Sequence, residues 1–402
     1  MAASRRTTVA ALGAAVALAL AGCGGDSGGS TTGSTSQRAK PPQVSTLASL
    51  GAGEGAINIL AWPGYAEDGT TDPTVNWVKP FEDETGCKAN VQVANTSDEM
   101  FEKMGNGDFD VVSASGDSSL RMIYAGKVAP VNTKLLTNWN DIAPFQKEQQ
   151  WNSVDGVDYG IPHGWGANLL SWRTDKVTTA PDSWGVVWDQ SSPYKGSITA
   201  YDSPTYLADA ALYLMATKPD LGIKNPYALD QKQFDAAVDL ATQQKSLLGG
   251  YWSSYTDAQK NFTSGTWVLG TSWQIIVNLA QADKAPVDAT LPKEGSTGWA
   301  DTWMVDAKSP HPNCAYLWMN HITTPKVQAQ VAEWFGEAPA NTKACALTSD
   351  AKHCEVFHAE DEAYFKRIWF WATPQSDCLD GRTDTKCVPY SEWTKAWSTL
   401  RS

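Results

Sequence analysis

The sequence lacks the short motifs that mark the common classes of enzyme. Its five histidines form no HExxH motif, which argues against a zinc protease. There is no GxSxG nucleophile elbow, no GxxxxGK[ST] phosphate loop, and no GxGxxG segment after a predicted strand. A glycosidase stays open, because a pair of catalytic carboxylates carries no sequence motif. Catalysis has no positive signal in this chain, and we expect no cofactor and no metal.

Long apolar runs and an excess of positive charge are also missing. After the first 22 residues no apolar run is long enough to span a bilayer. The formal charge is −13, from 44 acidic and 31 basic residues. A surface of this sign repels nucleic acid and attracts cations. The length of 402 residues suggests two domains of ordinary size.

The N-terminal segment has the features of an export signal. Arg5 and Arg6 precede an apolar run over residues 9–21, which is too short to span a bilayer as a stable helix. The run ends in Leu20-Ala21-Gly22-Cys23, which resembles a bacterial lipobox. The resemblance implies cleavage before the cysteine and a lipid on its sulfur. The alternative is an ordinary secretory signal with a chance cysteine.

The signal predicts where the protein works. Residues 1–22 are then a lipoprotein signal peptide, and Cys23 anchors the mature chain to the outer side of the cell membrane. Residues 23–55 are rich in Gly, Ser and Thr, so we expect a flexible tether there. The folded part is expected to be an extracytoplasmic monomer.

Six cysteines remain besides Cys23, and an even number in an exported chain favours disulfides. Two pairs share one spacing, Cys345-x8-Cys354 and Cys378-x8-Cys387. Each is predicted to form a local disulfide, which leaves Cys87 and Cys314 as the third pair. Zinc is the alternative, because His353 and His358 flank one cysteine, but export and the lack of a CxxC pair argue against it.

Strands and helices are predicted to alternate along the folded part, which begins near Ala56. The predicted strands are 57–62, 90–93, 109–112, 168–172, 197–201, 267–270 and 302–305. Helices are predicted from Asp72-Pro73 to Gly86, after a capping box at Thr96, and at 205–215, 233–247, 314–321, 325–335, 361–371 and 392–398. This alternation is typical of parallel sheets with helices on their faces.

Aromatic residues recur where predicted strands end or begin. The chain has 19 tryptophans. The aromatic residues at predicted strand ends are Trp62, Tyr65, Trp165, Trp273 and Trp299, and Trp299 stands two positions before Asp301. In open α/β sheets, ligands bind beyond the carboxyl ends of the strands. Aromatic faces beside a carboxylate attract ammonium groups, and each desolvated contact contributes on the order of 2 kcal/mol. The alternative for any single tryptophan is core packing.

Seven motifs follow one another in order along the folded part. They are Asn58-Ile59-Leu60-Ala61-Trp62-x2-Tyr65, Phe81-Glu82-x-Glu84-Thr85-Gly86, Phe109-Asp110-Val111-Val112, Ile161-Pro162-x2-Trp165-Gly166, Pro181-x-Ser183-Trp184, Phe262-x2-Gly265-x4-Gly270-x2-Trp273 and Leu291-Pro292-Lys293-Glu294-Gly295-x5-Asp301. Over roughly residues 57–401 the chain resembles the spermidine/putrescine-binding proteins of bacterial ABC importers.

The resemblance implies an α/β fold of the two-lobed periplasmic-binding-protein class (type II). Each lobe would be a mostly parallel sheet with flanking helices, and crossover strands would join the lobes. The first lobe would comprise 56–165 plus about 296–335, and the second 166–295 plus about 336–402. The resemblance implies no catalysis, and its partners would be a membrane permease and an ATPase.

The same resemblance assigns roles to residues. Trp62 and Tyr65 match aromatic ligand contacts of the first lobe, and Ser115 or Asp117 falls where ligand contacts follow the third strand. Trp273 matches a tryptophan that stacks on the methylene chain of the ligand.

Acidic positions agree with the family only in part. Asp301 matches the carboxylate that pairs with one terminal ammonium, and Asp202 falls where spermidine binders have an acid. Thr205 and Ile276 stand where other carboxylates of the family would fall. The loss of those carboxylates removes the partner of a second ammonium, so the ligand is a monocation or a differently spaced amine.

The sequence therefore predicts a tethered receptor that captures a small, polyamine-like organic cation for an ABC permease. One alternative is the same fold with a neutral sugar as ligand, and another is a secreted carbohydrate hydrolase. A basic residue beside Asp301 would favour the sugar. A hydrolase needs two carboxyl groups about 5–9.5 Å apart across a cleft.

Overall fold

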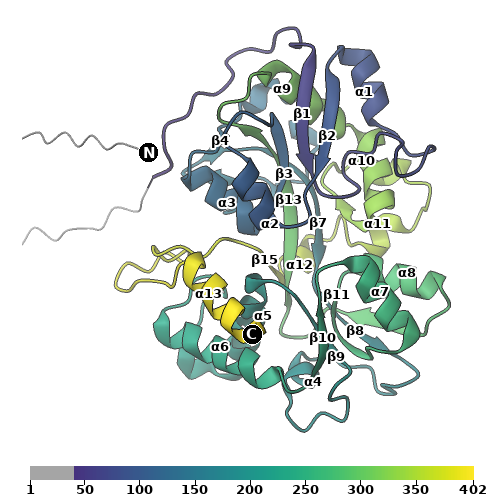
Figure 1. Ribbon diagram of the computed structural model, residues 1–402, viewed down its shortest axis with the longest axis vertical. Helices are drawn as coiled ribbons and strands as arrows, with labels where there is room; N and C mark the ends of the chain where they lie inside the picture. Colours follow the sequence, from purple (N-terminus) through teal and green to yellow (C-terminus); the bar gives the residue numbers. More distant parts are fainter. Residues whose placement is uncertain (1–39) are drawn as a thin grey trace, which may run out of the picture. The chain divides into compact units, whose positions relative to one another are not determined.

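The strand β1 (Ala56–Ala61) lies inside the sheet of the first of two lobes (Figure 1). The computed structural model describes residues 40–402. The first sheet has the strand order β14-β7-β13-β3-β1-β2, with bounds β2 (Lys88–Val93), β3 (Val111–Ser115), β7 (Ile161–Ala167), β13 (Ser296–Asp306) and β14 (Ala338–Pro339). The short strands β4 (Val128–Ala129) and β15 (Ile368–Phe370) also pair with β13.

Helices cover both faces of the first sheet. They are α1 (Val78–Thr85), α2 (Ser97–Lys103), α3 (Gly116–Tyr124), α9 (Pro312–Ile322) and α10 (Pro325–Val331). Ile59 of β1 packs in one core cluster with residues of α1 and α9, whereas its neighbour Leu60 packs in another with residues of α2 and α3. Successive strand residues point to opposite faces, so both faces of this sheet are buried.

The helix ends in this lobe follow local chemistry. Gly86 stops α1 in the left-handed conformation, with φ 74°, as the sequence predicts. Thr96 caps α2 by accepting from the N–H of Glu99, which is also as predicted. The predicted start of the first helix at Asp72 is wrong, because its carboxylate closes a local turn with Thr74 and the helix begins at Val78.

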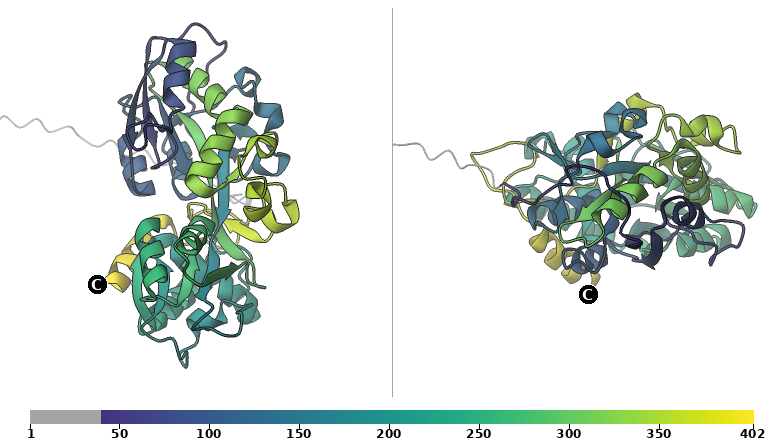
Figure 2. Two further views of the ribbon diagram at one scale, coloured as in Figure 1. Left: turned by 90° about the vertical axis from the view of Figure 1, so that its right-hand side faces the viewer. Right: turned by 90° about the horizontal axis from the view of Figure 1, so that it is seen from above.

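The second lobe has a five-stranded sheet of order β10-β9-β11-β8-β12. Its strands are β8 (Leu169–Arg173), β9 (Ile198–Tyr201), β10 (Leu248–Trp252), β11 (Leu269–Ser272) and β12 (Val287–Thr290). Its helices are α4 (Gly185–Trp188), α5 (Leu207–Thr217), α6 (Gln231–Gln244), α7 (Tyr255–Ser264), α8 (Gln274–Ala282) and α13 (Tyr390–Arg401), the last drawn yellow in Figure 2. Trp393 of α13 packs on Phe234 of α6, so the chain end belongs to this lobe.

Three stretches of chain cross between the lobes. Asn168 joins β7 to β8, residues 291–295 join β12 to β13, and residues 371–389 lead from β15 to α13. The two-lobed α/β fold with crossover strands is as expected. The sheets are mixed, however, and not mostly parallel, because β13 runs antiparallel to β3 and β7, and β8 runs antiparallel to β11 and β12. The reason is that β13 and β8 each begin at a crossing and run away from it, whereas β3 and β11 run toward the boundary between the lobes.

The segment after residue 336 differs from the expected division. β14 pairs with β7, and β15 pairs with β13, so residues 338–370 add two strands to the first sheet. The helices α11 (His353–Val356) and α12 (Glu362–Phe365) lie between these strands. The helix predicted over 361–371 is therefore wrong in its second half, where Ile368 and Phe370 are buried strand residues.

The described part of the expected tether is docked and not free. Leu47 and Leu50 pack against the core of the first lobe, and Glu54 accepts from the backbone N–H groups of Asn313 and Cys314 at the start of α9. A carboxylate at a helix N-terminus satisfies free N–H groups. The signal peptide, Cys23 and the tether up to residue 39 lie outside the described residues. Within residues 40–402 no helix has the length and apolar character of a membrane span.

All three predicted disulfides are confirmed. They are Cys87–Cys314, Cys345–Cys354 and Cys378–Cys387. The first joins β2 to α9 across 227 residues of sequence, and both of its cysteines are fully buried.

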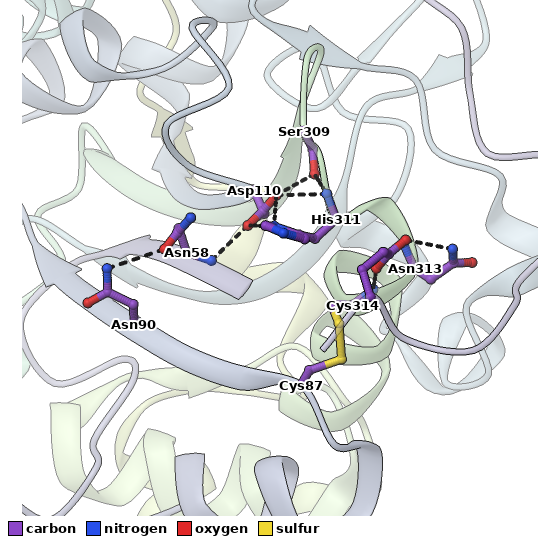
Figure 3. A network of polar contacts seen from close by, with 9 residues as sticks. Asn58, Cys87, Asn90, Asp110, Ser309, His311, Asn313 and Cys314 are labelled. Atoms are coloured by element: carbon purple, nitrogen blue, oxygen red, sulfur yellow. Dashed lines mark hydrogen bonds and ion pairs between the residues drawn. A yellow bond between two sulfur atoms is a disulfide. The ribbon is translucent and has the colours of Figure 1, made fainter. Parts of the chain in front are cut away.

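A buried carboxylate near this disulfide also connects α9 to strands of the first sheet (Figure 3). Asp110 accepts from the backbone N–H of Asn58 (2.7 Å) and from Ser309 Oγ (2.6 Å), and it lies 3.0 Å from His311 Nδ1. Ser309 and His311 both contact the carboxylate, and Ser309 Oγ accepts from the backbone of His311 and not from its ring. The three residues therefore connect β1, β3 and α9 and do not have the order of a catalytic triad.

Candidate functional site

The carboxyl ends of strands from both lobes face one cavity of about 340 Å³. The first lobe contributes the residues after β1 and β2 and the end of β3, and the second contributes the end of β9 and the residues after β10 and β11. The residues that line it are Trp62, Pro63, Asn95, Thr96, Ser115, Tyr201, Ser253, Ser254, Tyr255, Trp273, Trp299, Asp301, Phe335 and Trp371. A site between two sheets at their strand ends fits the general rule for α/β proteins.

Aromatic rings form much of the cavity wall. The ring centre of Trp273 lies 5.6 Å from that of Tyr201 and 5.9 Å from that of Trp299. Trp273 Nε1 donates to Asn168 Oδ1 at 2.9 Å, which fixes the indole next to the crossing between the lobes. Tyr201 stacks on Trp371 with centroids 5.4 Å apart. Such faces bind alkyl chains and ammonium groups.

Asp301 is the one carboxyl group among the residues that line this cavity. It lies in β13, opposite Ser115 of β3, and its side chain is only 3% exposed. Tyr65 Oη donates to Asp301 Oδ2 at 2.6 Å, and Ser115 Oγ donates to Asp301 Oδ1. No Lys, Arg or His lines the cavity within the described chain. Burial raises the pKa of Asp301 to about 7, against the effect of the two hydrogen bonds.

A second buried carboxyl group lies behind Asp301. Glu337 Oε2 is 2.7 Å from Tyr65 Oη, and Glu337 Oε1 is 3.4 Å from His163 Nε2. Gly164 leaves the room for it, because a Cβ atom there would lie 2.3 Å from Glu337 Cδ. Sequence reasoning missed Glu337. The signal was a single acidic residue within the otherwise apolar and small stretch 335–340.

The structure brings five of the nine predicted site residues to the cavity. They are Trp62, Ser115, Trp273, Trp299 and Asp301. Tyr65 lies directly behind Asp301, with its hydroxyl directed at the carboxylate. Asp117 is buried beside the site, where it accepts from Ser97 Oγ at 2.7 Å, and burial raises its pKa to about 6.

Two predicted residues do not reach the cavity. Trp165 is fully buried, with its ring edge-to-face on Phe365 and Phe370 in the core of the first lobe. Asp202 accepts from Trp397 Nε1 at 3.1 Å and pairs with Arg401 at 3.0 Å, so the C-terminal helix neutralises it. We therefore remove both residues from the candidate site.

Thr205 and Ile276, which replace expected carboxylates, are also buried away from the cavity. Thr205 Oγ1 donates to Ser203 Oγ, and Ile276 packs in the core of the second lobe. Sequence reasoning missed several polar residues of the cavity lining, which are Asn95, Thr96, Ser253, Ser254 and Tyr255. Asn95 and Thr96 follow a predicted strand, whereas Ser253, Ser254 and Tyr255 follow β10, which was not predicted, and small polar residues in loops give no distinct signal.

The comparisons with known proteins agree with this geometry. A family profile described as "Bacterial extracellular solute-binding protein" matches residues 76–356. The "Spermidine/putrescine-binding periplasmic protein" of Escherichia coli K12 is 26% identical over 313 residues, which cover 75% of this chain and 85% of that protein. The "Putrescine-binding periplasmic protein SpuD" of Pseudomonas aeruginosa UCBPP-PA14 is 24% identical over 361 residues, which cover 86% of this chain and 92% of that protein.

Solved structures show the same fold. The spermidine/putrescine ABC transporter substrate-binding protein PotD from Streptococcus pneumoniae has a TM-score of 0.67 at 18% identity, and the match covers 87% of this chain and 100% of that one. The lipoprotein Tp0655 of Treponema pallidum has a TM-score of 0.69 at 16% identity, with 86% and 99% covered. With its two lobes, its cavity and a profile match over most of its length, the chain belongs to the family of bacterial extracellular solute-binding proteins.

Proposed function

We propose that this solute-binding protein captures a small, polyamine-like organic cation and delivers it unchanged to an ABC permease. The observation that carries the proposal is Asp301, a buried carboxyl group on an aromatic cavity wall with no basic residue beside it. A buried carboxylate without a partner is costly, and an ammonium group supplies the missing partner. The curated relatives named above are binders of spermidine or putrescine.

The two alternatives fit the cavity less well. A sugar site would be favoured by a lysine or arginine paired with Asp301, and neither type lines the cavity in the described chain. A carbohydrate hydrolase needs a second carboxyl group across the cleft, but Asp301 alone lines the cavity, and Asp117 and Glu337 are buried behind its wall.

The charge pattern favours a ligand with one ammonium group at the Asp301 end. The other polar residues that line the cavity are neutral, among them Asn95, Thr96 and Ser254. Asp202 could have served a second ammonium, but it is already paired with Arg401. A second amine of the ligand would therefore meet neutral groups alone, or the ligand carries a polar, neutral group in its place.

Capture uses the two lobes in sequence. The ligand first meets Trp62 and Asp301 on the first lobe, and closure of the second lobe brings Trp273 over its alkyl chain. The crossing stretches at Asn168 and 291–295 act as the hinge. Domain closure around a ligand is a general switching mode, and a permease would bind the closed form. Lipid on Cys23 would keep the monomeric receptor at the outer side of the cell membrane, near its permease and ATPase.

A thermal-shift screen of the full chain tests the ligand class. The panel contains putrescine, spermidine, agmatine, n-butylamine, glycine betaine, glucosamine and maltose. We expect an amine to raise the melting temperature with increasing concentration, because a ligand that binds only the folded state stabilises it by mass action. Stabilisation by maltose alone would support the sugar alternative and contradict the proposal.

The affinity for an amine should depend on pH through Asp301. Only the ionised carboxylate attracts the ammonium, and burial raises its pKa to about 7. Below pH 7 the proton must leave, so affinity should fall by about tenfold per pH unit, and above pH 8 it should level off. The raised pKa also affects folding. Because this carboxyl group ionises at a lower pH in the unfolded chain, the empty protein should lose stability as the pH rises up to about 7.

Titration calorimetry between pH 5 and 9 measures this dependence. The slope should be reduced in Asp301→Asn, which has no proton to lose at this position. A wild-type affinity that stays constant from pH 5 to 9 would show that the ligand does not pair with this carboxylate.

Trp273→Ala should weaken amine binding by about 2 kcal/mol, roughly 30-fold, because the indole face over the alkyl chain is lost. Trp188→Phe is the matched control, since Trp188 packs on Tyr206 in the core of the same lobe and does not line the cavity. Calorimetry at pH 8 with both variants distinguishes the loss of a ligand contact from the effect of repacking the core of the lobe. Equal affinities in the two variants would assign Trp273 to the core.

A further inference from the structure

Tyr65, Asp301 and Glu337 form a chain of hydrogen-bonding groups at the wall of the cavity. Tyr65 Oη lies 2.6 Å from Asp301 Oδ2 and 2.7 Å from Glu337 Oε2. All three side chains are buried, and none is more than 3% exposed. A phenol has a single proton, so it can donate to only one of two carboxylates. The other short contact needs a proton that a carboxyl group provides.

The neighbours of the two carboxyl groups indicate which one is protonated. Asp301 accepts a further hydrogen bond from Ser115 Oγ and lines the cavity, where a cation can approach it. Glu337 does not line the cavity, and apart from Tyr65 its carboxyl group faces only His163 Nε2, which at 3.4 Å makes no hydrogen bond with it. Ionised Asp301 is therefore better solvated by the protein than ionised Glu337 would be.

His163 cannot supply a positive charge for Glu337. Gln328 Oε1 accepts from the backbone N–H groups of Ala340 (3.0 Å) and Asn341 (3.1 Å), so its Nε2 is the atom that faces His163 Nδ1 at 2.8 Å. A donor at this place makes Nδ1 an acceptor and puts the ring proton on Nε2. The imidazole is thus neutral, and burial lowers its pKa to about 3.

The other titratable groups around Tyr65, Asp301 and Glu337 are acidic, phenolic or neutral. Asp117 of α3 and Tyr201 of β9 face Asp301, and the negative charge of Asp117 raises the pKa of Asp301 further. His353 of α11 contacts only the backbone carbonyl of Glu337, at 2.8 Å. Burial raises the pKa of Glu337 well above its usual range. No cation contacts either carboxyl group among the residues that the structure describes.

We propose that Glu337 is a positioning residue that stays protonated at neutral pH, donates to Tyr65 Oη, and thereby commits the Tyr65 proton to Asp301. The two carboxyl groups together then carry one negative charge, not two. The part of this inference that concerns the ligand rests on the proposed function: the site accepts one ammonium group at this end, so a compound with two adjacent positive charges is excluded.

Infrared spectroscopy tests, without any ligand, whether the carboxyl group of Glu337 carries a proton. At pH 8 the full-length wild type should show the carbonyl stretch of a protonated carboxylic acid, which should shift when the glutamates carry ¹³C-labelled carboxyl groups. The same band should disappear in Glu337→Gln and persist in Asp301→Asn. Because the isotope shift uses the unaltered protein, it decides the question even if a variant fails to fold. A band that is absent, or that does not shift, overturns the proposal.

Binding of the best amine from the screen at pH 8 tests the positioning role. Glu337→Ala should lose about tenfold in affinity, because the Tyr65 oxygen loses its donor. Glu337→Gln should recover most of this loss, since its amide can donate to Tyr65 and accept from His163. If Glu337 were ionised, the Gln variant would lose as much affinity as Asp301→Asn, which contradicts the proposal. If no amine binds the wild type, the proposed function fails, whereas the infrared result still shows whether Glu337 is protonated.

Discussion

Replacement of Asp301 by Asn should weaken amine binding by about 1.5–3 kcal/mol at pH 8, which is roughly 10- to 150-fold. The reason is that the ammonium loses its one charged partner on the cavity wall. An amide at this position keeps one acceptor oxygen for Tyr65 or Ser115, and its NH2 group can donate to the other hydroxyl, because a hydroxyl oxygen also accepts. The variant should therefore fold, and titration calorimetry can measure the affinity directly.

Asp209→Asn is a suitable control for the loss of a buried carboxyl group. Asp209 is buried in α5, accepts from Thr297 Oγ1 at 2.9 Å, and does not line the cavity. Burial raises its pKa to about 7, as it does for Asp301. The control should bind the amine as the wild type does. An unchanged affinity in Asp301→Asn would remove this carboxylate from the site.

Removal of the Cys87–Cys314 disulfide should have the largest effect on stability. The bond closes a loop of 227 residues, so its loss should lower the free energy of unfolding by about 5 kcal/mol in the chain-entropy account. The double variant Cys87→Ala/Cys314→Ala and a denaturant titration measure the change. Amine binding should survive in conditions where the variant is folded, because the bond lies away from the cavity lining.

The Cys345–Cys354 disulfide is the matched comparison. Its sequence separation is 9, so the same account gives a loss of about 3 kcal/mol for Cys345→Ala/Cys354→Ala. The larger loss should therefore belong to the Cys87–Cys314 variant. If both double variants lose the same free energy, loop length does not determine what these bonds contribute here.

Local chemistry predicts much of the fold. Gly86 and Thr96 mark helix ends because backbone conformation and capping act within a few residues, and the equal cysteine spacing identifies two disulfides. The direction of β13 and the pairing of β15 were not predictable in this way. Both depend on partners distant in sequence. Ile368 and Phe370 are compatible with a helix in the sequence alone, and only their pairing with β13 makes them strand residues.

The candidate site shows the same division. Trp62, Trp273 and Asp301 were found because aromatic and acidic residues at strand ends are rare enough to form a pattern. Trp165 has the same sequence context, yet its neighbours in space are phenylalanines. Asp202 was assigned to the ligand by the family resemblance, and its pairing with Arg401, 199 positions away, could not be predicted from the sequence. Tertiary contacts of this length decide whether a side chain is in the core, in an ion pair or in the site.

A crystal structure of the protein with the amine that stabilises it most would test the central claim most directly. The account predicts the compound, chemically unaltered, in the cavity between Trp62 and Trp273, with one amine nitrogen within about 3.2 Å of an Asp301 carboxylate oxygen. A compound bound outside this cavity, or one inside it with no nitrogen near Asp301, would contradict the account.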